Sequence, residues 1–384
     1  MLELSGLAAQ LRDLGVRRVH TYAWRDLDDP HAGGSEVHAD EILRRWSEVG
    51  LEIVHRTSSF SQPRRFERNG YAVVQHGGRA GVVLRTPWEG WRRDRHSADA
   101  VIDIWNGLPW LSPIWFEGPR VTWLHHVHGP LWRESFPAPI ALVGRVVEAR
   151  VMPVLYRRSP VVTLSPSGRQ ELLHLGFPPD LVHVVEPGIS GAFRPDPTRR
   201  AATPLVVVVG RLALMKRHLD VVRAVAIARR TVPELHLELI GDGPDRAAVE
   251  AGVREHAAEE WCTLRGRVSE AELVDAYRRA WIFASASRSE GWGMVLTEAA
   301  ACGTPAVASR ITGHRDAVDE GRSGVLFDDV EECAAAIVRL VTRPDELARL
   351  QEGARAHAAN FDWDRAAARH LEILLTETSR RRPR

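Results

Sequence analysis

The sequence predicts an α/β protein made of two doubly wound domains, each built around a parallel sheet. Its 384 residues, 44% of them hydrophobic, suffice for two domains with a core each. Both halves of the chain alternate short apolar runs with amphipathic segments, as βαβ units do. Residues 193–204, rich in proline and arginine and without periodicity, are expected to link the domains. Two such domains would face a cleft at the carboxyl ends of their strands, where open α/β sheets bind ligands.

In the first half, strands are expected where apolar and β-branched residues cluster, over residues 17–23, 51–57, 100–103, 120–124, 161–164 and 182–185. Helices are expected where apolar residues recur every three or four positions, over residues 35–49, over residues 140–157 and in the segment that ends near residue 175. Pro153 should break the second of these helices, because proline lacks an N–H group and clashes with the preceding turn.

The second half restarts with residues 205–209, a continuous β-branched run typical of a buried parallel strand. Further strands are expected over residues 235–240, 263–265, 281–285 and 305–309. Helices are expected over residues 218–231, 246–259, 270–280 and 294–301. Ser269 has the side chain and position of an N-cap for the third of these helices.

Charge and cysteine content exclude several classes of protein. The formal net charge of +1 lacks the basic excess of a nucleic-acid binder. Three widely spaced cysteines form neither a zinc pattern nor a disulfide framework, which favours a reducing cytoplasm. The N-terminus does not resemble a signal peptide, and no apolar run approaches the roughly 20 residues of a transmembrane helix. A peripheral membrane contact stays open, for instance through the basic tail at 379–384, which is expected to be frayed.

The strand at 205–209 is followed by two cations. Gly210 and Arg211 end the strand, and Lys216, the only lysine of the chain, follows five residues later. Arginine can hold phosphate oxygens bidentately and lysine supplies a point charge, so the two could bind a diphosphate and neutralise it as it leaves. Taken alone, the same residues could equally be exposed cations on a solvated loop.

A second signal lies between residues 287 and 309, where Glu290 precedes a Gly-Trp-Gly sequence and Glu298 follows inside the next helix. Glycines let backbone N–H groups approach a ligand, and a helix N-terminus favours phosphate. Two carboxylates beside a phosphate site suggest hydroxyl recognition, with Glu298 on a ribose and Glu290 on a sugar. A helix-capping role explains one of the two glutamates more easily than both.

The segment EGWGMVLTE, followed by AAACGTPAVAS, resembles the retaining glycosyltransferases of family 4, the glycosyl transferases group 1 with the GT-B fold of two Rossmann-like domains. GRLALMK, IGDGP, LRGRVSEAEL and ITGH accompany it in the family's order. HAGGSEVHADEI, the strand at 120–126, VEPGI and FDWD extend the likeness over nearly the whole chain. The number and order of these motifs make the resemblance specific.

The resemblance implies a role for each matching position. Arg211 and Lys216 would bind the donor diphosphate, Glu298 the ribose and Glu290 the donor sugar. Backbone groups that would join Glu290 at the sugar are those of Gly291, Trp292, Gly293, Met294 and Val295. Further implied contacts are the backbone of Arg267 and Val268 at the base, and Gly33 and Gly34 at the donor phosphate and acceptor.

A histidine that closes the strand at 120–124 would lie beside the transferred sugar. The sequence His125-His126-Val127-His128 leaves either His125 or His126 in that role. Zinc binding is set aside, because no carboxylate or cysteine of matching spacing lies nearby and the resembled family needs no metal. A solvated histidine-rich turn is the remaining alternative.

The implied organisation is an acceptor-binding domain of residues 1–189 plus a returning helix at 361–384, and a nucleotide-sugar-binding domain of residues 190–360. The implied activity is a retaining, metal-independent hexosyltransferase, with a UDP-sugar as donor and no other cofactor. The acceptor would be a small molecule, a glycan or a lipid. Rival hypotheses are a nucleotide-sugar epimerase, a phosphorylase or a non-catalytic GT-B binding protein.

Some patterns stay unassigned or are declined. The two Asp-x-Asp sequences at 26–28 and 362–364 are read as coincidental, although the first could line an acceptor site. The glycine-rich segment 77–81 is read as a turn or a mobile loop. Six tryptophans of the first half belong either to the core or to an acceptor groove: Trp88, Trp91, Trp105, Trp110, Trp115 and Trp132. The sequence predicts no oligomeric state.

Overall fold

The computed structural model describes residues 2–30, 32–59, 62–78, 88–92, 99–105, 109–129, 132–133 and 137–381. The chain forms two compact units, one of Met1–Gly188 with Trp363–Arg384 and one of Ile189–Asp362. Segment 193–204 is therefore not a linker, because it lies within the second unit. There Arg194 O accepts from Arg278 Nε at 2.8 Å, and Ala201 N donates to Arg279 O at 3.0 Å, so the segment is bound to helix α11 (Glu270–Arg279).

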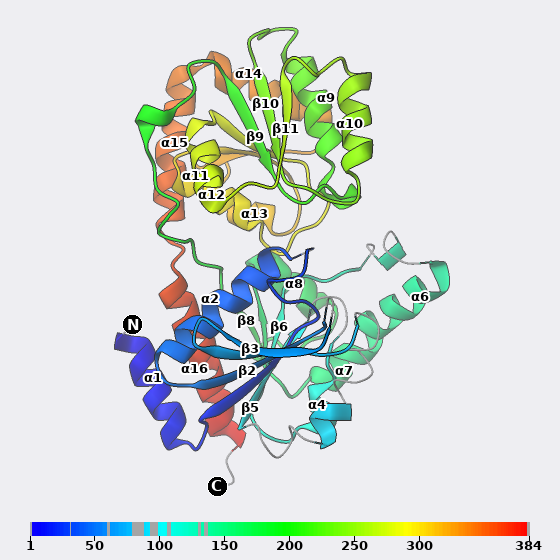
Figure 1. The fold of residues 1–384 in the computed structure, drawn as a ribbon, viewed down its shortest axis with the longest axis vertical. Helices are drawn as coiled ribbons and strands as arrows, with labels where there is room; N and C mark the ends of the chain where they lie inside the picture. Colours follow the sequence, from blue (N-terminus) through cyan, green and yellow to red (C-terminus); the bar gives the residue numbers. More distant parts are fainter. Residues whose placement is uncertain are drawn as a thin grey trace. The chain divides into compact units, whose positions relative to one another are not determined.

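The first unit contains an eight-stranded sheet in the order β3-β4-β2-β1-β5-β6-β7-β8 (Figure 1). Its strands are β1 (Arg18–Tyr22), β2 (Glu52–Thr57), β3 (Arg64–Arg68), β4 (Tyr71–Gln75), β5 (Ala100–Trp105), β6 (Arg120–Leu124), β7 (Val161–Thr163) and β8 (Val182–Val184). Neighbours are parallel except β3 and β4. The β3–β4 hairpin was not predicted, although Asn69-Gly70 (φ +47° and +85°) is a strong hairpin signal.

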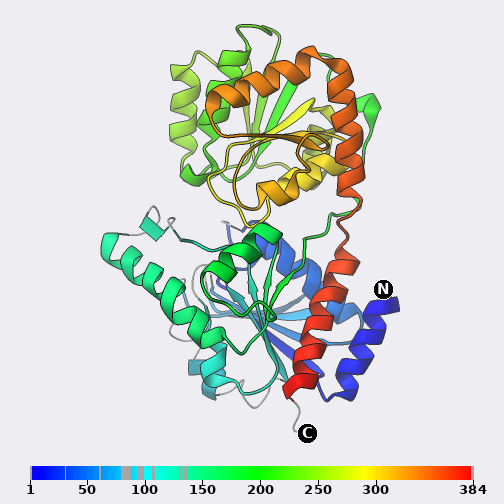
Figure 2. The same ribbon diagram turned by 180° about the vertical axis from the view of Figure 1, so that it is seen from behind.

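Helices of the first unit are α1 (Leu2–Asp13), α2 (Gly34–Glu48), α4 (Ser112–Trp115), α6 (Ala138–Val146), α7 (Met152–Tyr156), α8 (Pro166–His174) and α16 (Trp363–Arg381). The returning helix α16 packs against α1, α2 and β6 (Figure 2). At its start, a Cβ on Gly188 would lie 2.2 Å from the Trp363 backbone N, so only glycine fits where the two segments meet.

One helical expectation for the first unit is confirmed and one needs correction. The helix expected over 140–157 is interrupted near Pro153 as predicted: it is divided into α6, a π-helical turn (Val147–Val151) and α7, because Pro153 cannot donate a backbone hydrogen bond to the preceding turn. The tail expected to be frayed is helical to Arg381, since Arg380 and Arg381 bind the buried carboxylate of Glu377 and donate to Arg158 O. Residues 382–384 of that tail lie outside the described residues.

The second unit contains a six-stranded parallel sheet in the order β11-β10-β9-β12-β13-β14. Its strands are β9 (Leu205–Val209), β10 (His236–Ile240), β11 (Cys262–Gly266), β12 (Ile282–Ser285), β13 (Ala306–Ser309) and β14 (Gly324–Phe327). This is the Rossmann order, in which the chain winds outward from β9 in one direction and from β12 in the other. Between β9 and β12 lies the switch point, where ligands of such sheets bind at the carboxyl ends of the strands.

Helices of the second unit are α9 (His218–Ala228), α10 (Arg246–Glu255), α11, α12 (Met294–Ala301), α13 (His314–Ala317), α14 (Val330–Thr342) and α15 (Pro344–Ala358). Helices α9, α10 and α14 pack together on one face of the sheet, and α11, α12 and α15 on the other (Figure 1). Ser269 caps α11 as predicted: its Oγ accepts from Glu272 N, while the Glu272 carboxylate accepts from Ser269 N at 2.8 Å. The pattern of two parallel α/β sheets matches the predicted fold class.

Among the described helices, none is both long and apolar enough to cross a bilayer.

Candidate active site

The loop after β9 carries the two predicted diphosphate ligands, Arg211 and Lys216. Gly210 N donates to Ile240 O at 2.9 Å and Leu212 N to Asp242 O at 3.1 Å, which ties this loop to the end of β10. Lys216 ends a short 3₁₀ turn (Leu214–Lys216) immediately before α9. Backbone contacts thus hold both cations at the carboxyl edge of the sheet.

Two glycines of the IGDGP turn make this arrangement possible. A Cβ on Gly241 (φ +138°) would lie 1.9 Å from Gly210 O, and one on Gly243 would lie 2.3 Å from Leu212 O. No side chain fits at such distances, so the turn after β10 must be glycine for the loop after β9 to lie against it. The sequence analysis used these glycines only as part of a motif, without this steric role.

The loop after β12 meets the loop after β9 across the switch point. The Lys216 ammonium group pairs with the Glu290 carboxylate, which also accepts from Ser287 Oγ at 2.9 Å. Arg288 N donates to Met215 O at 2.8 Å, so a backbone hydrogen bond joins the same two loops. The structure therefore brings together two residues that are 74 positions apart in the chain and were predicted to share a site.

The Lys216 charge determines the protonation state of Glu290. Burial raises the pKa of Glu290, but the Lys216 cation and hydrogen bonds from Lys216 and Ser287 outweigh that effect and hold the pKa below its usual value. Glu290 is therefore ionised at neutral pH. Its ion pair with Lys216 is a preformed contact that an anionic ligand would have to share or displace.

The loop of residues 291–293 depends on a second pair of glycines. Gly293 (φ +97°) precedes α12, and a Cβ on Gly313 (φ +83°) would lie 2.6 Å from Glu290 O and 2.8 Å from Trp292 N. The turn before α13 thus packs directly beneath the Glu290 loop. The Trp292 side chain is buried edge-on against Phe361, with ring centroids 5.1 Å apart, so Trp292 can meet a ligand only through its backbone.

His314 was missed as a structural support of this loop. It begins α13, is fully buried, and its Nδ1 donates to Ser309 O at 3.0 Å. Burial lowers the pKa of His314 to about 4, so the ring is neutral. A Cβ on Gly293 would lie 3.1 Å from its Cδ2 atom, which places the ring directly against the Gly-Trp-Gly turn.

Glu298 lies in the second turn of α12 and differs from Glu290 in its electrostatics. Its Oε2 accepts from the hydroxyl of buried Tyr277 at 3.1 Å. The pKa of Glu298 is raised to about 7, because burial and the Glu270 charge raise it by more than the Tyr277 hydrogen bond lowers it. Sequence reasoning did not find Tyr277, because its only signal is a tyrosine within the amphipathic pattern of α11.

The remaining predicted donor contacts surround the same edge of the sheet. Met294 and Val295 form the half-buried first turn of α12. Arg267 is exposed and Val268 is half-buried in the segment after β11. All of them, like Arg211, Lys216, Glu290 and Glu298, belong to the second unit.

Gly33 and Gly34 belong to the first unit, where they precede and begin α2. Gly33 N donates to Glu36 Oε2 at 2.7 Å, and Glu36 pairs with Arg25 at 3.3 Å. Within 4 Å, a Cβ on Gly33 would meet only the Glu36 carboxylate, so glycine is not required by packing inside this unit. His31, at the start of the same motif, lies outside the described residues.

The two candidate histidines after β6 occupy different environments. His125 is buried, and its Nε2 lies 3.3 Å from His38 Nδ1 on α2. His126 is half-buried and stacks on His128, with ring centroids 4.4 Å apart. His126 is thus the more accessible of the two, while His125 contributes to the interior.

Three imidazoles gather in that interior. His38, His125 and His370 come from α2, the end of β6 and α16, and the ring of His370 lies 5.2 Å from that of His38. Burial lowers the pKa of all three, that of His370 to about 3. Neutral rings therefore pack here against Trp123. In the part of the chain that the structure describes, no group of three or more His, Cys, Asp or Glu residues could hold a metal ion.

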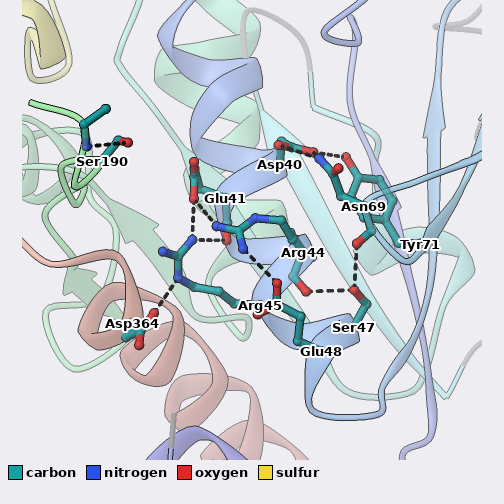
Figure 3. Close-up of polar contacts among 11 residues, drawn as sticks. Asp40, Glu41, Arg44, Arg45, Ser47, Glu48, Asn69, Tyr71, Ser190 and Asp364 are labelled. Atoms are coloured by element: carbon teal, nitrogen blue, oxygen red, sulfur yellow. Dashed lines mark hydrogen bonds and ion pairs between the residues drawn. The ribbon is translucent and has the colours of Figure 1, made fainter. Parts of the chain in front are cut away.

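Both Asp-x-Asp sequences are engaged in ion pairs. Asp26 is buried and accepts from Arg68 at 2.6 and 3.0 Å and from Gln75 at 2.6 Å. Asp364 accepts from Arg45 at 2.7 Å, which joins α16 to the outer face of α2 (Figure 3). These carboxylates stabilise the first unit.

The tryptophans of the first half divide into two groups. Trp105, Trp110, Trp115 and Trp132 are at most 5% exposed and belong to the core. Trp88 and Trp91 are 56% and 47% exposed. Of the glycine-rich segment 77–81, only residues 77 and 78 are described, and Gly77 has the positive φ (+76°) of a turn.

Comparison with known proteins identifies the family. The glycosyl transferases group 1 match residues 191–357. The D-inositol 3-phosphate glycosyltransferase of Thermobispora bispora is 31% identical and aligns over 92% of each chain. That of Saccharomonospora viridis is 34% identical over 94% of this chain and 93% of the relative. The chain belongs to the family 4 glycosyltransferases.

Solved structures agree on the fold of this glycosyltransferase. Sucrose-phosphate synthase from Thermosynechococcus elongatus superposes with a TM-score of 0.77 at 19% identity, over 93% of this chain and 98% of that one. HepE from Anabaena, solved with UDP and glucose, superposes with a TM-score of 0.74 at 18% identity, over 94% and 100%. The predicted GT-B fold and enzyme class are confirmed, and these relatives lend no support to the epimerase, phosphorylase or non-catalytic alternatives.

Proposed function

We propose that this glycosyltransferase moves a sugar from a UDP-sugar to a hydroxyl group of its acceptor and retains the configuration at the anomeric carbon. The observation that carries the proposal is the pairing of Lys216 with Glu290 across the switch point of the second sheet, with Arg211 on the same loop. A cation held at this edge by a backbone-bonded loop suits a diphosphate.

In donor binding, each charged group of the site would bind a different part of the donor. Lys216 and Arg211 would take the diphosphate, and the displaced or shared Glu290 carboxylate would accept from hydroxyls of the donor sugar. Glu298 would accept from the ribose when it is ionised. Backbone groups of residues 291–295 would complete the sugar site, because Gly291 and Gly293 leave the main chain open to close approach.

Catalysis would rest on stabilising the leaving diphosphate. As the bond between sugar and phosphate breaks, negative charge grows on the phosphate oxygens, and the two preorganised cations lower the energy of that state. The acceptor hydroxyl would attack the same face that the diphosphate leaves, which retains configuration. We name no covalent nucleophile. The cations supply the charge that a metal ion would otherwise provide, so no metal is proposed.

Uridine is the proposed base and a phosphorylated polyol the first acceptor to test. HepE, which shares the fold, was solved with UDP and with UDP-glucose. The relatives that align over the whole chain are named for D-inositol 3-phosphate. In the first unit, half-buried His126 is the proposed neighbour of the transferred sugar. The three buried free cysteines suit a reducing compartment, and we propose the cytoplasm.

The donor test is a thermal-shift comparison of UDP, GDP, ADP and TDP with their sugar conjugates. A ligand that binds only the folded state raises the melting temperature, so we expect the uridine series to do so. Turnover with the shifting donor is then measured for Lys216→Met, where a loss of about 10²- to 10³-fold is expected. Nuclear magnetic resonance of the product would report the anomeric configuration.

Arg223→Met is the matched control, because Arg223 is an exposed cation on α9 outside the site. It should leave both the UDP shift and turnover unchanged. Wild-type turnover by Lys216→Met would refute the leaving-group role, and a shift by GDP, ADP or TDP instead of UDP would refute the donor assignment.

A further inference from the structure

The segment from α6 to α7 is apolar on two opposite faces. Its inner face is buried in the first unit and consists of Ala141, Gly144, Glu148, Met152 and Tyr156. Its outer face carries six apolar side chains that are 47–62% exposed: Ile140, Leu142, Val143, Val146, Val151 and Val154. A surface helix normally carries polar side chains on the face that points away from the core, so this mostly apolar outer face indicates a partner.

Exposed large hydrophobic side chains of the described residues are concentrated on this outer face. Of the twelve large hydrophobic side chains that are exposed in the described residues, six lie within these 15 positions. Monomeric proteins seldom expose contiguous apolar patches without a function, whereas single exposed apolar residues are normal. The clustering therefore indicates an interaction surface rather than ordinary exposure.

Two neighbouring segments also expose apolar side chains. Ser112 of α4 and Tyr156 of α7 both donate to the buried carboxylate of Asp103, so α4 lies beside α7 (Figures 1 and 2). Ile114 of α4 is 67% exposed. Residues 88–92 pack on α4 through Gly90, where a Cβ would lie 2.9 Å from the Trp115 ring; this segment exposes Trp88 and Trp91.

The outward charges of the α6–α7 segment all have one sign. Between residues 137 and 158 the basic side chains are Arg145, Arg150, Arg157 and Arg158. Glu148 is the one acid in that range; it faces inward, where it accepts from His128 N, Gly129 N and Trp132 Nε1. Within the described part of the chain, none of the four arginines forms an ion pair.

We propose that this face, formed by residues 140–154 with Trp88, Trp91 and Ile114, docks on the surface of an anionic lipid bilayer. Valine, leucine and isoleucine side chains would enter the boundary between headgroups and acyl chains, while the arginines extend to lipid phosphates. Exposed tryptophans suit the same interface, because an indole ring has an apolar body and a polar N–H group.

The charge pattern favours a bilayer over a second copy of the chain. A two-fold interface through α6–α7 would place this segment against itself, so its unpaired arginines would meet arginines, while Glu148, the acid of the segment, is buried. An anionic lipid surface supplies the opposite charge across the whole patch. The proposal is independent of the donor and acceptor assignments.

The test is co-sedimentation of the full-length protein with vesicles of phosphatidylcholine containing about one-third phosphatidylglycerol, compared with pure phosphatidylcholine. We expect binding to the anionic vesicles that weakens as salt is raised. In the double variant Val143→Glu/Val154→Glu, which changes two exposed positions, affinity should fall at least about tenfold. Leu2→Glu, at an exposed apolar site on α1, is the matched control and should bind like the wild type.

Two further readouts separate the alternatives. An unchanged melting temperature of the double variant would show that it folds, so that loss of vesicle binding reports the surface itself. Failure of the wild type to bind anionic vesicles, or wild-type binding by the double variant, would overturn the proposal. So would a dimer in light scattering that the double variant abolishes, because that result would assign the face to a second copy of the chain.

Discussion

The loops that follow the strands differ in construction between the two units. After β9, β10 and β12, short backbone hydrogen bonds and glycines in van der Waals contact with neighbouring carbonyls hold the loops together, as at Gly241 and Gly313. After β6, by contrast, a side chain holds the segment in place: the buried ring of His125 packs against the ring of His38. Main-chain geometry therefore shapes the loops of the second unit, whereas side-chain packing shapes the segment after β6 in the first unit.

The electrostatics of the two units differ as well. The second unit places an ionised Glu290 against Lys216 at its ligand edge, where opposite charges are preformed. In the first unit, burial keeps neutral the three imidazoles that α2, α16 and the end of β6 contribute. We infer that the proposed donor site depends on preorganised charge, which any diphosphate sugar needs, while packing of neutral side chains shapes this part of the first unit.

After Lys216→Met, for which a loss of about 10²- to 10³-fold is expected, the largest effect should come from the steric support of the Glu290 loop. Gly313→Ala would place a methyl group 2.6 Å from Glu290 O and force the loop to move. Because a displacement of about 1 Å in a catalytic group can cost about 10²-fold, we expect kcat/KM for the donor to fall by about 10- to 100-fold. Steady-state kinetics with varied donor would measure this loss.

Gly321→Ala is the matched control for that variant. Gly321 has a similar positive φ of +78°, but a Cβ there would meet no heavy atom within 4 Å. Gly321→Ala introduces the backbone strain of an alanine at positive φ but no steric clash with a neighbouring loop. Its kinetics should therefore stay close to those of the wild type. Equal losses in both variants would mean that strain, and not the contact with the loop, explains the effect.

An intermediate effect is expected from Tyr277→Phe. Because the Glu298 pKa is about 7, its carboxylate is increasingly ionised between about pH 6 and pH 8, and UDP should bind more tightly as pH rises. Loss of the Tyr277 hydroxyl removes the hydrogen bond that lowers this pKa. The pH midpoint should therefore move upward, and UDP affinity at pH 7 should fall by about three- to tenfold.

Calorimetric titration of UDP across this pH range would test the Tyr277 prediction. Glu298→Gln is the control, because it cannot ionise and so removes the contribution of this side chain from the pH profile. If the wild type and Glu298→Gln share one pH profile, Glu298 does not bind the ribose, and the electrostatic contrast between the two glutamates has no role in donor binding.

The smallest expected effect concerns the acid stability of the first unit. His370 has a folded-state pKa of about 3, below its ordinary value of 6.5, so the unfolded chain takes up the proton first as pH falls. Stability is therefore lost as pH falls from about 7 towards about 3. Between about pH 7.5 and pH 5.5, His370 should account for about 1.4 kcal/mol of that loss.

Urea unfolding at both pH values would measure the free energy of unfolding of the wild type and His370→Gln. The variant should lose less stability on acidification, because glutamine does not titrate in this range. His174→Gln, at an exposed position of α8, controls for the substitution. An identical pH dependence in the wild type and His370→Gln would contradict the burial of a neutral His370.

Much of the fold was open to prediction because parallel strands and amphipathic helices impose regular spacing. Strand β6 and helix α12 begin and end at the predicted residues. Hairpin β3–β4 was missed although the Asn69-Gly70 turn and the apolar run of β4 mark it, because β3 is mostly charged and so lacks the apolar pattern of a strand. Segment 193–204 was misplaced because its hydrogen-bond partners, on α11, lie about 80 residues further along the chain.

The sequence by itself determined the family, the class of two α/β domains and most of the strands along the chain, and it predicted the cations and carboxylates of the donor site, because these depend on local pattern and residue type. Only the tertiary structure decided that Lys216 pairs with Glu290, that Tyr277 binds Glu298, that His125 is buried, and that an apolar face on α6–α7 is uncovered. These features depend on contacts between residues that are distant in the chain. Such contacts decide which side chains are buried and which charges lie next to them, and burial and neighbouring charge in turn set the protonation state.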